Sequence, residues 1–371
     1  MKTTATSFNQ YEDGGGVYVS AAFGPDGRLW RVVPERQYVY VDSSSDQGHS
    51  FTRPIRLNSE SQKIKASAEG RPQIAVDRDG RVYVAYTAQA RLPNSVFVSI
   101  SDPNGRNFSP PFEVSRSAAE ASNYEPQLAV SPQNTVYLFW HDERDRGDYR
   151  IPGNSIYYAR LDPNGVPPPN YRAIKQQWEC ECCRIAVAFE EDGTPLVLTR
   201  FIYAENTRDH GLIRLPPEAG SGQAWRVTFD DWEIEACPEH GPSLARSSEG
   251  RLHMAWFTLG KQRRGLFYAN SENQGLKFSK PMPVGNPVNL PGHADLISRG
   301  EEVALAWEEF NGSSHRIMLS RSRDSGNTWS PAKIIAESSS ETDYPFLLSD
   351  DQRIYLSWNT GLEGYRLIPL D

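Results

Sequence analysis

One phrase of alternating apolar residues returns along the whole chain. In its clearest copy, a strand with Ile74 and Val76 leads into a turn at Gly80, and a second alternating strand, residues 82–86, ends on an aromatic side chain. Alternation with a period of two on both sides of a glycine turn predicts an antiparallel hairpin. The chain is therefore expected to consist of repeated hairpins.

Seven copies of the phrase follow one another at intervals of 51 to 59 residues. Aligned on Ile74, the other copies fall at Ala21, Leu128, Ile185, Leu244, Leu296 and Leu347. In four copies the second strand ends on a tryptophan, at Trp140, Trp256, Trp307 and Trp358. A unit of four short strands cannot bury both faces of its sheet alone, so neighbouring units must stack, and radial stacking closes a ring. The sequence predicts an all-β fold, a seven-bladed β-propeller.

The repeat also predicts the organisation of the chain. One domain is expected over residues 1–371, with blades that start near residues 17, 71, 125, 182, 241, 293 and 344. The last copy leaves room for only three strands before the chain ends. Residues 3–9 are expected to add the fourth strand and so to leave no exposed edge. A six-bladed ring is the alternative if one phrase is an insertion.

Composition and charge narrow the possible partners. The chain has 39 basic and 47 acidic residues, a net charge of -8, and therefore lacks the broad basic field that a nucleic acid requires. It contains no apolar run of the roughly 18 residues that a membrane helix needs. The N-terminus lacks the basic-then-apolar pattern of a signal peptide. If the protein is exported, as we expect, its signal is absent from this chain.

A second motif recurs between the hairpins. Residues 322–329 read Ser-Arg-Asp-Ser-Gly-Asn-Thr-Trp, and related phrases begin at Ser44, Ser101 and Ser271. The pattern is similar to the Asp-box of the sialidase-like BNR-repeat propellers. Its aspartate can hydrogen-bond to backbone two residues on, and its glycine supplies a positive φ. The resemblance implies a structural turn between third and fourth strands, away from the active face.

The same resemblance implies a site on the channel face and, within it, hydrolysis of an acidic sugar. The resemblance implies a site with three arginines around the carboxylate of the substrate, a tyrosine nucleophile and a carboxylic acid. The candidates at the starts of inner strands and in the loops after second strands are Arg71, Arg144 and Arg200, with Glu125 or Asp142 as acid and Tyr344 as nucleophile. Sialidases of this family resemble six-bladed rings, and the Arg-Ile-Pro string at residues 150–152 falls in the third blade. We therefore expect a small polar ligand, such as a carbohydrate, and leave hydrolysis open.

All four cysteines lie in two short segments. Cys180, Cys182 and Cys183 precede the inner strand of the fourth blade, and Cys237 precedes that of the fifth. Because neighbouring blades lie side by side at the axis, we expect one cluster of the four thiols, with His240 and His293 close by. The pair of segments resembles a branch of bacterial BNR-repeat proteins that carry Cys-x-Cys-Cys and Cys-Pro-x-x-Gly-Pro, which implies membership and no particular activity.

Several chemistries fit this cluster. A disulfide from Cys237 to Cys180 or Cys182 would suit an exported protein. Thiolates together with His240 or His293 would suit copper or zinc. Free thiols are the third alternative. The function hypotheses are accordingly a carbohydrate-binding or hydrolytic site, a metal-binding propeller, and a non-catalytic scaffold for a protein partner.

Overall fold

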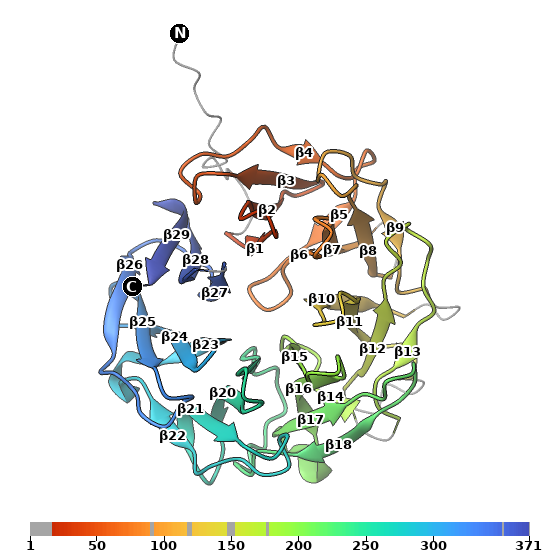
Figure 1. The fold of residues 1–371 in the computed structure, drawn as a ribbon. Helices are drawn as coiled ribbons and strands as arrows, with labels where there is room; N and C mark the ends of the chain where they lie inside the picture. Colours follow the sequence, from red (N-terminus) through yellow and green to blue (C-terminus); the bar gives the residue numbers. More distant parts are fainter. Residues whose placement is uncertain are drawn as a thin grey trace.

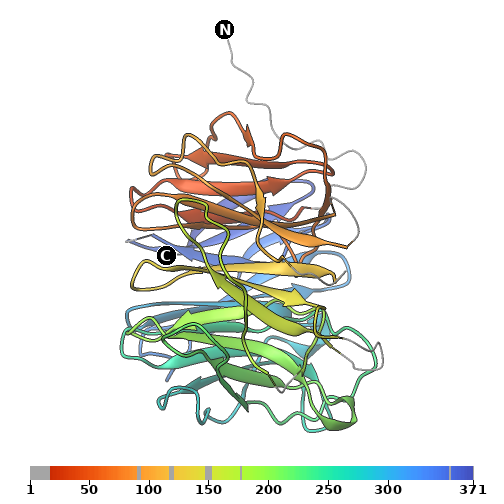
Figure 2. The ribbon, with the colours of Figure 1, turned by 90° about the vertical axis from the view of Figure 1, so that its right-hand side faces the viewer.

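Antiparallel strands form almost all of the regular structure. The computed structural model describes residues 17–89, 93–116, 121–146, 153–175, 178–350 and 352–370. Seven sheets are arranged around a central axis (Figure 1), and seen from the side their strands run approximately along that axis (Figure 2). The prediction of a seven-bladed β-propeller is confirmed. Among the described residues, none belongs to a helix with the length and apolar character needed to cross a membrane.

The first three blades follow the chain from the N-terminal side. Blade 1 contains β1 (Ser20–Phe23), β2 (Leu29–Pro34), β3 (Val39–Ser44) and β4 (Ile55–Arg56). Blade 2 contains β5 (Lys63–Lys65), β6 (Gln73–Val76), β7 (Val82–Gln89), β8 (Ser95–Ile100) and β9 (Phe112–Glu113). Blade 3 contains β10 (Asn123–Val130), β11 (Val136–Asp142), β12 (Ser155–Arg160) and β13 (Tyr171–Arg172).

The other four blades complete the ring. Blade 4 contains β14 (Trp178–Glu179), β15 (Ala186–Phe189), β16 (Pro195–Ile202), the 3-10 helix η1 (Ala204–Asn206), β17 (His210–Arg214) and β18 (Gln223–Arg226). Blade 5 contains β19 (Ser243–Arg246), β20 (Leu252–Leu259), β21 (Arg264–Ser271) and β22 (Met282–Val284), followed by η2 (Pro287–Asn289). Blade 6 contains β23 (Gly292–Arg299), β24 (Glu302–Phe310), β25 (His315–Ser322) and β26 (Lys333–Ser338). Blade 7 contains β27 (Phe346–Ser349), β28 (Ile354–Thr360) and β29 (Gly364–Leu370).

The four repeated tryptophans lie at equivalent places in second strands, as predicted. They are Trp140 in β11, Trp256 in β20, Trp307 in β24 and Trp358 in β28, and each is at most 2% exposed. Each indole packs among apolar residues of two adjacent blades. Each indole N–H also has an acceptor, for example Asp142 for Trp140 at 2.8 Å and Glu309 for Trp307 at 3.0 Å. The four tryptophans therefore help to join blade 2 to blade 3, and blades 4, 5, 6 and 7 to one another in turn.

Opposite the tryptophan of the second strand, the innermost strand of blades 3 and 6 interrupts its hydrogen-bonded pairing with that strand. In blade 3 the register shifts between Tyr124 and Gln127, opposite Trp140. In blade 6 it shifts between Gly292 and Asp295, opposite Trp307. These bulges place one residue of each strand, Glu125 and His293, at positive φ.

Three further blades show larger interruptions at the same level. Residues 66–72 separate β5 from β6 in blade 2, and residues 180–185 separate β14 from β15 in blade 4. In blade 7, an isolated bridge between Thr342 and Thr360 precedes β27, so residues 343–345 lie outside the ladder. The inner strands of five blades are thus interrupted at the same face of the ring. We call the opening of the central channel at this face the channel mouth, and the interrupted segments surround it.

The Asp-box-like turns lie between third and fourth strands. In the turn between β25 and β26, Ser322 Oγ accepts the backbone N–H of Gly326 at 2.8 Å, and Asp324 accepts that of Thr328 at 2.8 Å. The turn at Ser44 is built alike, since Ser44 Oγ accepts the N–H of Gly48 at 2.8 Å. Asp46 and Asp324 therefore serve local turn geometry.

Buried polar contacts close the ring between its first and last blades. Strand β1 packs beside β27. Asp343 of blade 7 accepts the backbone N–H of Val19 at 3.0 Å and pairs with Arg71 of blade 2, whose Nη1 lies 2.6 Å from its Oδ2. The ion pair thus reaches past blade 1. The strand predicted for residues 3–9 lies outside the described residues.

We expect the substitution Asp343→Ala to destabilise the protein by about 3–5 kcal/mol, because it leaves the Arg71 guanidinium buried without its counter-charge. Urea unfolding measures the loss. The control is Asp26→Ala, which removes an exposed partner of Arg28 and should cost at most about 1 kcal/mol. Equal losses in the two variants would show that the Arg71–Asp343 pair does not hold the ring closed.

Candidate functional site at the channel mouth

The segment between β5 and β6 projects toward the middle of the ring (Figure 1) and carries Glu69 there. Glu69 Oε2 accepts the backbone N–H groups of Arg184 at 2.8 Å and Gly241 at 2.9 Å, so one carboxylate joins blades 2, 4 and 5. Burial alone would raise the pKa of Glu69, but the neighbouring His293 and the charge of Arg184 hold this pKa below its usual value. Glu69 is therefore an ionised anchor.

Two glycines allow this close packing. A Cβ on Gly241 would lie 2.2 Å from Cγ of Arg184, and a Cβ on Gly70 would lie 2.7 Å from Cγ of Glu125. Both distances are shorter than real Cβ atoms show. Gly241 belongs to the Cys-Pro-x-x-Gly-Pro motif, and its place beside Glu69 gives that glycine a physical role.

Glu125 is the acid at the channel mouth whose side chain lacks full satisfaction. Its φ is 55°, a conformation that costs free energy for a residue followed by Pro126, and its Oε2 is buried without a hydrogen-bond partner in the protein. The Nε2 atom of His141 lies 3.5 Å from Oε2 of Glu125. Burial, followed by repulsion from Glu69, Cys180 and Glu239, raises the pKa of Glu125 well above its usual value. The ionised form of Glu125 is therefore disfavoured relative to that of an ordinary glutamate.

Four aromatic rings form a continuous stack across blades 5 to 7. The ring centroid of His240 lies 4.0 Å from that of Phe257 and 4.2 Å from that of His293. The centroids of His293 and Tyr344 are 3.5 Å apart, and the interplanar angles of the three pairs are 13–22°. Burial and the neighbouring His293 lower the pKa of His240 to about 3, so this imidazole is neutral. Burial and the charges of Glu69 and Glu308 raise the pKa of Tyr344 above its usual value. This environment keeps Tyr344 as a neutral phenol and does not activate its hydroxyl group as a nucleophile.

The three predicted arginines are engaged within the protein. Arg71 pairs with Asp343, and Arg200 donates to the backbone carbonyls of Arg208, His240 and Phe257 at 2.9–3.0 Å. Among the described residues we find no arginine triad that converges on an open carboxylate site. The sialidase-type triad is therefore not formed by these residues. Residues 149–152, which hold the Arg-Ile-Pro string, lie outside the described residues.

Asp142 and Arg144 face away from the channel. Asp142 is fully buried and accepts both the Trp140 indole and the Arg144 guanidinium, whose Nη2 lies 2.6 Å from Oδ2. Arg144 also donates to Ser115 and Asn170, which flank outer strands of blades 2 and 3. Of the two predicted acids, only Glu125 lies at the channel mouth.

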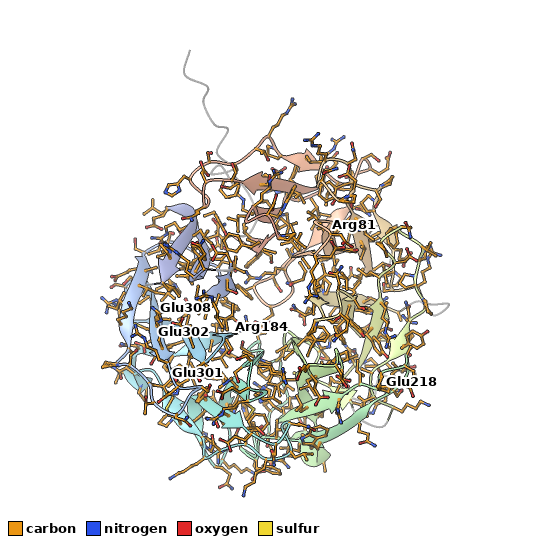
Figure 3. All side chains as sticks on the ribbon, viewed as in Figure 1. Arg81, Arg184, Glu218, Glu301, Glu302 and Glu308 are labelled. Carbon is orange, nitrogen blue, oxygen red and sulfur yellow. The ribbon has the colours of Figure 1, made fainter. Side chains whose placement is uncertain are left out.

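Sequence reasoning missed Arg184 and Glu69. Arg184 lies near the middle of the ring in Figure 3; its guanidinium donates to the Ala294 carbonyl and lies over the Phe346 ring. It follows Cys183 directly, so its proximity to the cysteine motif was the only signal. Glu69 precedes a repeat phrase, and nothing in the apolar alternation marks a loop residue of that kind.

Three of the four cysteines form one cluster, whereas Cys237 and the two histidines do not belong to it. Sγ of Cys180 lies 3.8 Å from that of Cys182 and 3.9 Å from that of Cys183, and all three thiols are buried. Cys237 is exposed and lies near Cys182, but outside the group that the three buried thiols form. Of the described residues, only the three buried cysteines form a group of ligand atoms within 4.8 Å, which corrects the expectation for His240 and His293. All four thiols are free, so no disulfide joins the two segments.

The sequence matches no family model and no curated protein, whereas solved structures share the fold. A Hadza microbial sialidase is 14% identical over 93% of this chain and 73% of that chain, with a TM-score of 0.57. An ulvan lyase of polysaccharide lyase family PL25 is 12% identical over 96% and 92%, with a TM-score of 0.58. An α-L-arabinanase of Penicillium chrysogenum is 13% identical over 86% and 96%, with a TM-score of 0.52. At these identities the likeness shows the propeller fold.

The raised pKa of Glu125 generates a prediction about stability. The folded chain keeps a proton that the unfolded chain releases as the pH rises above the usual range of glutamate, so the free energy of unfolding falls by up to about 1.4 kcal/mol per pH unit. Glu125→Gln removes this term. In urea unfolding from about pH 4 to pH 8, the variant should match the wild type at the acidic end and exceed it at the basic end.

Glu218, which lies at the outer rim in Figure 3 and is exposed, provides the matched control. Glu218→Gln should follow the wild-type pH dependence throughout. Parallel curves for Glu125→Gln and the wild type would mean that Glu125 ionises like an ordinary glutamate, and the assignment of a protonated acid would then be wrong.

Proposed function

We propose that this propeller binds a carbohydrate at the channel mouth and that Glu125 is the proton donor of this site. The observation that carries the proposal is the bulge of β10, which turns the Glu125 carboxyl group, with its unpartnered Oε2 and raised pKa, into the mouth of the channel. Bulges are common next to active sites, where they re-aim a side chain. The names of the similar folds, a sialidase, a polysaccharide lyase and an arabinanase, support a carbohydrate as the ligand class.

The chemistry of glycosidic bonds fits an acid of this kind. Cleavage requires a proton on the departing oxygen, and a carboxylic acid delivers it at neutral pH only if burial or a neighbouring charge raises its pKa. Glu69 supplies part of that charge and is itself held by two backbone N–H groups. In this proposal Glu69 keeps Glu125 protonated and does not react. Two carboxyl groups with pKa values displaced in opposite directions mark an acid and its electrostatic partner.

The aromatic stack supports the same ligand class. Tyr344, at the end of the stack, is half-buried, and His293 keeps a small exposed fraction of 17% with its Nδ1 3.7 Å from Glu69. Ligand sites combine apolar ring surfaces with a few convergent polar groups. In this proposal the stack positions the sugar and Glu125 transfers the proton.

Binding and turnover should be tested with a panel of three probes, namely a fluorogenic sialoside, ulvan and arabinan. We expect binding by at least one polymer and, where cleavage occurs, a loss of about 100-fold or more in Glu125→Gln, because general acid catalysis contributes about 10²–10⁴-fold. Glu218→Gln should behave as wild type. We expect no turnover of the sialoside, because Arg71 and Arg200 are engaged within the protein.

The pH profile separates an acid from a merely structural residue. If Glu125 donates the proton, activity falls as the pH rises through its raised pKa, and this limb disappears with Glu125→Gln. Failure to bind any of the three probes, or an unchanged activity of Glu125→Gln, would contradict the proposed function.

A further inference from the structure

We propose that Cys180, Cys182 and Cys183 form a thiolate site for a thiophilic d10 cation, Zn(II) or Cu(I), and that Cys237 supplies the fourth ligand. The ligands of this site are residues other than those assigned to proton donation or sugar binding. Its residues come from the interrupted inner strand of blade 4 and from the loop that precedes β19 in blade 5.

The distances between the sulfur atoms fit a metal centre. Two thiolates on one ion, each at about 2.3 Å and at the tetrahedral angle, are separated by about 3.8 Å. The Sγ atoms of Cys182 and Cys183 lie 3.8 Å and 3.9 Å from that of Cys180. A disulfide would instead bring two sulfur atoms to about 2.05 Å. The three thiols are thus spaced as ligands of one ion and not as bonded pairs.

The surroundings of the thiols suit a charged thiolate centre. The Arg208 guanidinium donates to Sγ of Cys180 at 3.1 Å, and the backbone N–H of Cys180 donates to the carbonyl of Arg200 at 2.7 Å. Three thiolates on a monovalent or divalent cation carry net negative charge, which a buried guanidinium offsets. Hydrogen bonds of this kind to ligand atoms orient the ligands and tune the affinity of a site.

Cys237 provides both the fourth ligand and the route from solvent. It is exposed and lies near Cys182, which is 9% exposed, while Cys180 and Cys183 are fully buried. Its loop belongs to a different blade, so the bound ion would join blades 4 and 5. Sulfur ligands select soft or borderline ions, and a d10 ion accepts three or four of them without a strong geometric preference.

The test uses the full chain, purified under reducing conditions and freed of metal by a chelator. Zn(II) and Cu(I) are titrated separately against a competing chromophoric chelator, and Co(II) is used as a spectroscopic probe of thiolate ligation. We expect one ion per chain and a sulfur-to-cobalt charge-transfer band. Cys183→Ser should weaken binding by more than about 100-fold, beyond the 10–100-fold that loss of an outer-shell group causes. The preference between the Zn(II) and Cu(I) titrations identifies the ion.

Variants at the rim of the site keep the proposal falsifiable if Cys183→Ser does not fold. Arg208→Lys should weaken binding by about 10–100-fold, and Cys237→Ser should weaken it while leaving a three-thiolate cobalt spectrum. Thermal unfolding with and without the ion should show a larger stabilisation in the wild type than in these variants at the same ion concentration. Unchanged affinity in Cys183→Ser and Cys237→Ser, or a reduced protein that binds neither ion, would overturn the proposal. A stable disulfide found by mass spectrometry after air oxidation, together with no metal binding after reduction, would also overturn it.

Discussion

Backbone groups that lose their ladder partners need new ones, and this need shapes the channel mouth. Where inner strands break, buried N–H and C=O groups remain, and each is costly unless it is paired. Charged side chains fill these places. Glu69 accepts two N–H groups, Asp343 accepts that of Val19, and Arg200 donates to three carbonyls. Apart from Arg208, which lies in the same blade as Arg200, these partners lie on a neighbouring blade or beyond, so the same contacts hold the blades together.

This requirement explains why charge at the channel is a poor guide to chemistry. Most acids and arginines there have complete sets of partners, and their removal would expose backbone or an opposite charge. Glu125 differs, since Oε2 has no hydrogen-bond partner in the protein and its backbone adopts a conformation that costs free energy. The position of an unpartnered acid at the channel mouth is thus a better guide to a candidate reactive group than the number of charges there.

Sequence reasoning reached the ring, the blade number and the places of the four tryptophans, because alternation and repeat spacing encode them directly. It also placed the two cysteine segments before inner strands of adjacent blades, but only Cys180, Cys182 and Cys183 form a close group. It could not foresee that Arg71 and Arg200 bind internal partners. In the sequence, an arginine that hydrogen-bonds to backbone carbonyls cannot be distinguished from one that binds a ligand. Nor could it find the bulges at Glu125 and His293, which change one residue of register and leave the apolar pattern intact.

The ion pair between Arg71 and Asp343 has a consequence for how the protein folds. Its partners are 272 residues apart in the chain, and the bond from Val19 to Asp343 spans 324 residues. Contacts between such distant residues form only after a large loss of chain entropy, and they slow folding. During synthesis the first six blades can fold before the seventh emerges. They then form an incomplete ring, in which the faces of blades 1 and 6 that pack against blade 7 are uncovered. Ring closure is therefore a late step, and the interval before it is when the chain is most open to pairing with another copy.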